Sequence, residues 1–471
     1  MLEEYLLPIV AVSLLLGGPL LLRGAQHPIV FFFAAIFFTS ILKTPELPVV
    51  REKFALTEIC MLLTWLFWTQ IPKASLRRPT DRVVTPLGIA FIVACTLSAV
   101  FGILQLKGHH GSLTRVYGAV LVEVLNYAYG VMIVLSTVRL IDRWERLTGA
   151  VFAWLAGMAV ASVVGTMALA GIAPSFAYEE GTRRICSTLR NENQVPSMIL
   201  PLITIPIMLA AHRRLNAIPR ALMLALTATA FLAALGTGSR TAVLMLIIAA
   251  AALIVTLSQD SSSHRLLNLS QLRTLALSFI GALVTYFVIA WAAFDGNYSL
   301  VRTPSWQRPA ALLIEAYDGK RDLDNTRPRQ IRAAIGKFWE SPLLGTGPKL
   351  GGRKVGEEIH NTYVSLLLET GIVGLLLHVS LIIQATLYCM RAVKRCPYHW
   401  YRMMGTGLLI GMPLLFLYNN TMLGLRQRNI WFLIGIMFAF TNLVMLHVPA
   451  PIGMRLPRWL RVWRPAIVDG E

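Results

Sequence analysis

Apolar stretches recur along almost the whole chain, and each is long enough, at about 17–25 residues, to cross the hydrocarbon core of a membrane as a helix. They constrain the fold because a chain inside a membrane must satisfy its backbone hydrogen bonds within helices or a closed barrel. The strands of a membrane barrel would alternate in polarity over about 10 residues, and these stretches show no such alternation. Only 14% of the residues are charged. The sequence therefore predicts an all-α, polytopic membrane protein.

Basic linkers between the apolar segments give the orientation. Under strict alternation, the positive linkers 73–82, 212–220 and 391–402 and the C-terminal tail fall on one side, which the positive-inside rule makes cytoplasmic. Trp459 and Trp463 lie between arginines of the tail and predict an interfacial anchor. The thirteen apolar segments are 5–22, 28–43, 55–72, 84–106, 117–140, 147–172, 194–211, 218–236, 240–258, 272–294, 362–390, 403–421 and 429–447.

One long polar connection, residues 295–361, is inserted into what we predict to be a single membrane domain covering 1–471. Within it, 328–340 has the periodicity of a helix, which Ser341-Pro342 ends, and 344–348 reads as a turn. We therefore expect short helices in this large external loop. The predicted apolar stripe of the helix consists of Ile331, Ala334, Ile335 and Trp339.

The net charge of +19 would point to nucleic acid in a soluble protein. In a membrane protein much of it follows from the positive-inside rule, so we expect membrane lipid and no nucleic acid as a partner. Only Cys186 of the five cysteines falls in a predicted outer loop, which gives no disulfide framework. The positive charge on the outer side is what requires a function.

The first of three outer basic sites combines Arg184 and Arg190 with Asn191 and Asn193. Guanidinium groups and amide donors suit a pyrophosphate or a sugar. A solvated loop that attracts lipid headgroups accounts for the same residues equally well.

The second site is the glycine-rich turn at 236–240, which ends in Gly238-Ser239-Arg240. A turn that opens a helix presents backbone N–H groups to an anion, and Arg240 adds a bidentate donor. The alternative is a short turn whose arginine extends to the membrane interface.

The third site is His360-Asn361 with Tyr363, where the long loop re-enters the membrane. A histidine can act as a general base, a hydrogen-bond donor or a cation near neutral pH. The alternatives are a helix cap for the His-Asn pair and an ordinary interfacial aromatic for Tyr363.

Other acidic or histidine groups give weaker signals. Asp322 and Asp324 have the spacing of a metal-binding pair, but the basic residues around them favour a solvated loop. Glu123 and Glu369 fall within spans, where a charge is costly and is either functional or paired. We therefore predict no metal site and no cofactor.

In their order, these sites resemble the O-antigen ligase family of the O-antigen ligase and polymerase superfamily. Ser187 and Glu192 depart from the glycine and proline that many relatives carry there. The matching residues are Arg184-x-x-Ser187-Thr188-Leu189-x-Asn191-x-Asn193, Gly238-Ser239-Arg240, Trp339-Glu-Ser-Pro342-Leu-Leu-Gly345-Thr-Gly347, and His360-Asn361-x-Tyr363 followed by Leu368-Glu369-x-Gly371-x-x-Gly374.

The resemblance implies about twelve membrane helices with both termini cytoplasmic, whereas thirteen spans would place the N-terminus outside. It implies an O-antigen ligase in the inner membrane of a Gram-negative cell, with its active site facing the periplasm. The donor would be undecaprenyl-pyrophosphate-linked O-antigen, and the acceptor would be a sugar hydroxyl of lipid A–core oligosaccharide. The transfer would be metal-independent and inverting.

In that reaction the pyrophosphate would be bound by Arg184 and Arg240, with Arg190 as a further binding residue. His360 would activate or bind a substrate. Ser239, Asn191, Asn193, Asn361 and Tyr363 would contribute to substrate binding. The nearest alternative is an O-antigen polymerase with the same donor, and a protein oligosaccharyltransferase is a third enzyme. A lipid-linked glycan transporter is the alternative of another class, although the charges cluster at one face and no repeat is visible.

Overall fold

The computed structural model describes residues 27–42, 56–71, 78–105, 113–179, 184–211, 215–259, 326–356 and 358–446, with isolated positions between 281 and 311. The described part is all-helical, as predicted, and it is a multi-pass membrane protein by the length and hydropathy of its helices. Seven helices in this part are long and apolar enough to cross a membrane. They are α4 (Asp81–Gln105), α5 (Leu113–Leu140), α6 (Trp144–Leu169), α9 (Ala217–Gly236), α15 (Thr362–Arg395), α16 (His399–Tyr418) and α17 (Arg428–Met445).

Two further apolar helices, α2 (Ile29–Phe38) and α3 (Leu56–Leu66), are shorter, and a third, α10 (Arg240–Gln259), is counted as an apolar helix only over Arg240–Thr256. The predicted total of twelve spans stays a prediction. Segments 5–22 and 272–294, the tail anchor, Asp322, Asp324 and the 295–325 part of the long loop lie wholly or largely outside the described residues.

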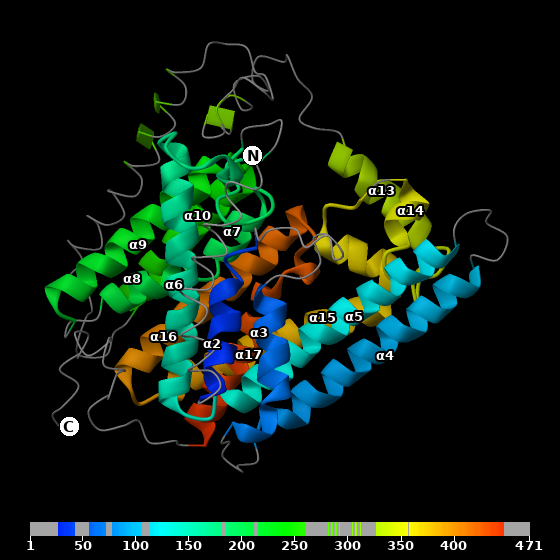
Figure 1. Cartoon of the computed structure of the whole chain (residues 1–471), viewed down its shortest axis with the longest axis horizontal. Coiled ribbons are helices and arrows are strands. Elements are labelled where there is room, and N and C mark those ends of the chain that lie inside the picture. Colours follow the sequence, from blue (N-terminus) through cyan, green and yellow to red (C-terminus); the bar gives the residue numbers. More distant parts are fainter. Residues whose placement is uncertain are drawn as a thin grey trace.

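Helix α17 forms the centre of the bundle (Figure 1). Almost every one of its side chains is buried, and it packs against α5 and α15. A membrane helix whose side chains are buried on every side lies among other helices and not against lipid. Its N-terminal end therefore lies enclosed by neighbours, and the outer basic residues near that end face a cavity between helices.

The apolar segment 194–211, predicted as one span, is broken into α7 (Gln194–Ile199) and α8 (Thr204–Ala210). Pro201 lies in the break, where it lacks the N–H that would continue the helical ladder. Neither piece is long enough to cross a membrane alone, so the prediction of one continuous span here is wrong.

Helix α15 is interrupted at Gly371, whose backbone is left-handed and extended (φ 68°, ψ −172°). The segment 341–347 fills the interruption. Thr346 N donates to Leu368 O (2.8 Å), Gly347 N donates to Glu369 O (2.9 Å), and Ile372 N donates to Pro342 O (2.9 Å). The loop thus satisfies backbone groups that the break would leave unpaired.

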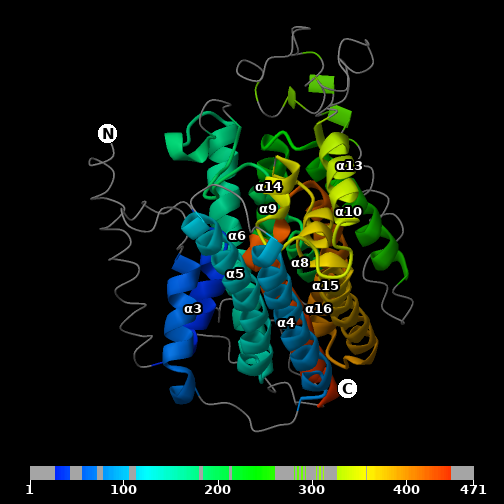
Figure 2. The same ribbon diagram turned by 90° about the vertical axis from the view of Figure 1, so that its right-hand side faces the viewer.

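The predicted loop helix is confirmed as α13 (Thr326–Phe338), which with α14 (Gly351–Val355) lies against the start of α15 (Figure 2). The predicted stripe is wrong in part. Ala334 is buried against Ile359, whereas Ile335 is 44% exposed and Trp339 is 70% exposed. The helix ends before Trp339, so that residue leaves the stripe.

Candidate functional site

The turn between α9 and α10 reverses the chain and carries the buried side chains of Thr237 and Ser239 before the exposed Arg240. Gly238 has φ of 70°, a left-handed conformation that glycine adopts without strain. Ser239 caps α10, because its Oγ accepts from Ala242 N at 3.3 Å. The next side chain, Arg240, is exposed and makes no ion pair within the described residues. The turn therefore offers a helix N-terminus and a free guanidinium together.

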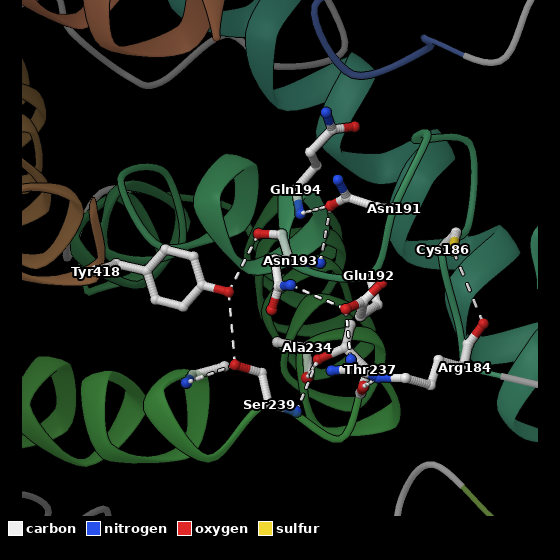
Figure 3. Close-up of polar contacts among 11 residues, drawn as sticks. Arg184, Cys186, Asn191, Glu192, Asn193, Gln194, Ala234, Thr237, Ser239 and Tyr418 are labelled. Atoms are coloured by element: carbon white, nitrogen blue, oxygen red, sulfur yellow. Dashed lines mark hydrogen bonds and ion pairs between the residues drawn. The ribbon is translucent and has the colours of Figure 1, made fainter. Parts of the chain in front are cut away.

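Arg184 lies directly beside this turn, although 53 residues separate it from Thr237. Its Nε donates to Thr237 O at 3.4 Å, and its guanidinium pairs with the buried carboxylate of Glu192 (Figure 3). Burial raises the pKa of Glu192, and the charge of Arg184 acts in the opposite direction. Arg184 and the α9–α10 turn thus form one cluster, and Glu192 holds Arg184 in it.

Asn193 and Tyr418 connect this cluster to the rest of the molecule. The Asn193 side-chain amide donates to Glu192 Oε1 (2.8 Å), and Tyr418 OH donates to Asn193 O (3.1 Å). Tyr418 OH also lies 3.5 Å from Ser239 Oγ, as Figure 3 shows. The tyrosine at the end of α16 therefore joins the 184–193 segment to the α9–α10 turn.

A pocket of about 930 Å³ adjoins the cluster and contains a second group of predicted residues. His360, two residues before α15, is exposed there, while Arg184, Ser239 and Arg240 are not among the residues that line it. Asn193 belongs to both places. The predicted residues that line the pocket are Arg190, Asn191, Asn193 and His360.

Three predicted binding residues have local structural contacts. Asn191 Oδ1 accepts from the backbone N of Asn193 (3.1 Å) and of Gln194 (3.0 Å) at the start of α7. Asn361 is the N-cap of α15 and accepts from two backbone N–H groups at 3.0 Å each. Tyr363 OH donates to Phe416 O (2.9 Å), and its ring packs on that of Phe416. These contacts give all three a role in the fold, and their role in binding stays a prediction.

We predicted no site role for Arg426 and Arg428, which line the pocket from the turn before α17 and from the first residue of that helix. Both lie in the short segment between two apolar runs on the predicted outer side, which is the signal that could have identified them. Arg426 pairs with Glu123 and Glu358, and Arg428 pairs with Glu58 at 2.8 Å. Burial raises the pKa of Glu358, but Lys349 and Arg426 outweigh it and hold that pKa below its ordinary value.

The two buried glutamates of the predicted spans are paired. Glu123 forms its ion pair with Arg426, and Glu369 accepts a hydrogen bond from Tyr127 OH at 3.0 Å. Their positions within spans predicted that each was either functional or paired, and both side chains have partners. Within the described residues, no three His, Cys, Asp or Glu side chains gather as a metal site would require.

The fold and the site define a multi-pass helical membrane protein in which the cluster of Arg184 with the α9–α10 turn lies beside a pocket lined by apolar and charged side chains. The family model of O-antigen ligase matches residues 225–379, about a third of the chain. The resemblance to the O-antigen ligase family is therefore confirmed over the stretch that holds Arg240, the 341–347 loop and His360. No curated protein matches the chain. The matched stretch is similar to glycosyltransferase-like enzymes of lipopolysaccharide synthesis, which act on lipid-linked glycan and lipid substrates.

Proposed function

We propose that this protein is an O-antigen ligase of the inner membrane. It transfers a glycan from undecaprenyl pyrophosphate to a sugar hydroxyl of lipid A–core oligosaccharide at the periplasmic face. The observation that carries the proposal is the cluster of Arg184 with the turn that exposes Arg240, next to a pocket lined by His360. Residues 53 or more positions apart in sequence thus form one polar region.

The arginine cluster supports binding of the donor pyrophosphate. As the bond from the anomeric carbon to the pyrophosphate oxygen breaks, negative charge grows on the leaving group. Guanidinium groups and the N-terminus of α10 stabilise that charge better in the transition state than in the ground state. Arg184 would exchange Glu192 for the phosphate, and Arg240 is exposed and ready to bind.

His360 supports activation of the acceptor. Its imidazole would accept the proton of the sugar hydroxyl as that oxygen attacks the anomeric carbon from the side opposite the pyrophosphate. The new glycosidic bond forms with inversion, undecaprenyl pyrophosphate leaves, and the histidine later releases its proton to water. Because arginines compensate the leaving charge, the proposed reaction needs no divalent metal.

The test is transfer by the purified protein, mixed with undecaprenyl-pyrophosphate glycan and lipid A–core in the presence of EDTA. Glycan should appear on lipid A–core. Arg184→Ala or Arg240→Ala should slow the transfer by about 10²–10³-fold, and His360→Ala by about 10²–10⁴-fold. Arg391→Ala is the matched control, because this exposed arginine lies at the opposite end of α15 from His360.

Two outcomes would contradict the proposal. Longer chains on the undecaprenyl carrier, with none on lipid A–core, would identify a polymerase. Activity that disappears in EDTA and returns with a divalent cation would contradict the metal-independent reaction.

A further inference from the structure

The pocket beside His360 has nearly balanced charge, which distinguishes it from the arginine cluster. Three of the four arginine and lysine side chains that line it lie against acidic ones, so little net positive charge remains to attract an anion. Such pairs still have unused N–H donors and carboxylate lone pairs, which suit sugar hydroxyls. The pairs are Arg426 with Glu123 (2.8 Å) and Glu358 (3.0 Å), Arg428 with Glu58 (2.8 Å), and Lys349 with Glu358 (3.4 Å).

The α9–α10 turn has the opposite character. Arg240 makes no ion pair within the described residues and stands at the N-terminus of α10, where the helix dipole favours negative charge. The anionic part of one substrate would therefore bind at the turn, and the neutral part of the other would bind in the pocket. At about 930 Å³, the pocket has room for a ligand of several sugar rings.

The pocket also reaches the outer surface of the helices between α3 and α5. Leu62 of α3 and Leu125 of α5 line it and are 49% and 56% exposed. One turn further along α3 the gap is closed, because Trp65 donates to Ser136 Oγ (2.8 Å) and packs edge-on against Tyr129. The pocket thus has an apolar mouth at its side and polar groups within.

We propose that this pocket binds the neutral sugars of a membrane-anchored acceptor, whose lipid part remains outside the mouth between α3 and α5. The sugar hydroxyl that reacts lies at the His360 end. This assignment rests on the proposed glycosyl transfer and divides its two substrates: the donor pyrophosphate lies at the α9–α10 turn, and the acceptor glycan lies in the pocket.

Photo-cross-linking tests the assignment without requiring turnover. A photoreactive amino acid is placed at Leu62 or at Leu125 in the full chain, reconstituted in liposomes with lipid A–core or with undecaprenyl-pyrophosphate glycan. Leu121 is the matched control, since it lies one turn from Leu125, is 59% exposed, and does not line the pocket. We expect capture of lipid A–core at 62 and 125, reduced by unlabelled lipid A–core, and weak capture at 121.

Equal capture at all three positions, or capture of the undecaprenyl glycan alone, would overturn the assignment. Selective capture of lipid A–core by a protein that transfers no glycan would instead support the pocket and contradict the proposed function. The two failures are therefore distinguishable.

Enzyme kinetics provide a second test, in which a larger side chain fills the mouth of the pocket. Leu62→Trp and Leu125→Trp should raise the KM for lipid A–core about tenfold and leave the KM for the donor unchanged. Leu121→Trp should change neither. A rise in the donor KM alone would place the donor in the pocket and overturn the assignment.

Discussion

Arg426, in the turn between α16 and α17, donates through Nε to Oε1 of Glu123 in α5, 2.8 Å away. Its other end donates to Glu358 at 3.0 Å, two residues before His360. One guanidinium therefore joins a buried helix position, the turn between two spans and the segment that carries the candidate base. Glu123 is buried and Glu358 is exposed, so the two pairs should differ in energy.

Removing Arg426 should destabilise the protein more than removing its buried partner. Arg426→Gln leaves the carboxylate of Glu123 buried without a counter-charge, at a cost of about 3–5 kcal/mol. In Glu123→Gln the arginine keeps Glu358 and access to water, so the loss should be smaller. Thermal unfolding in detergent measures both, and the double variant should recover part of the loss. Strictly additive losses would show that the pair is not coupled.

Glu358→Gln should affect turnover more than stability. The pair is exposed, so its contribution to the free energy of unfolding should be about 0–1 kcal/mol. Loss of the restraint on the segment before His360 should lower kcat about 10–100-fold, because small misplacements of a reacting group are costly. Glu340→Gln breaks a comparable exposed pair with Lys337 (2.7 Å) and should leave kcat unchanged. An equal effect of both variants would contradict a positioning role.

Gly345→Ala should disrupt the contact between the 341–347 loop and the break in α15. Gly345 has φ of 71°, and an added Cβ would lie 2.5 Å from Gly371 N, so we expect a loss of about 3 kcal/mol or more. Gly356→Ala is the control, because its φ is 84° but nothing lies within 4 Å of the added atom. It should cost only about 1 kcal/mol of backbone strain. Similar melting temperatures for both variants would contradict the tight packing at Gly345.

The buried carboxyl of Glu192 should make stability fall as the pH rises. Burial raises its pKa above the ordinary 4.5, so the folded protein holds this proton more tightly than the unfolded chain. Its contribution is therefore complete below pH 4.5 and is lost as the pH rises through the raised pKa. Glu192→Gln, which does not ionise, should flatten the dependence of the melting temperature on pH over that interval. Glu145→Gln, at an exposed carboxyl of α6, is the control and should not. If the melting temperature of Glu192→Gln depends on pH as that of the unaltered protein does, the raised pKa of Glu192 does not control this stability.

Local features of the site were predictable because they depend on residues close in sequence. The glycine-rich turn before Arg240, the helix over 326–338 and the polar start of α15 each follow from short patterns. The break at Pro201 was also present in the sequence, but hydropathy concealed it, because an interrupted apolar segment is as apolar as a continuous one.

Apolar length and charge, which can be read directly from the residues, were enough to predict a helical membrane protein and to suggest that its basic groups gather at one face. The contacts of Arg184 with Thr237 and Glu192, and of Arg426 with Glu123 and Glu358, became apparent in the folded molecule alone. Such pairs link positions far apart in the chain, and the packing of α5 and α15 around α17 brings them together. No local pattern records that packing, because each apolar helix can be buried against many others.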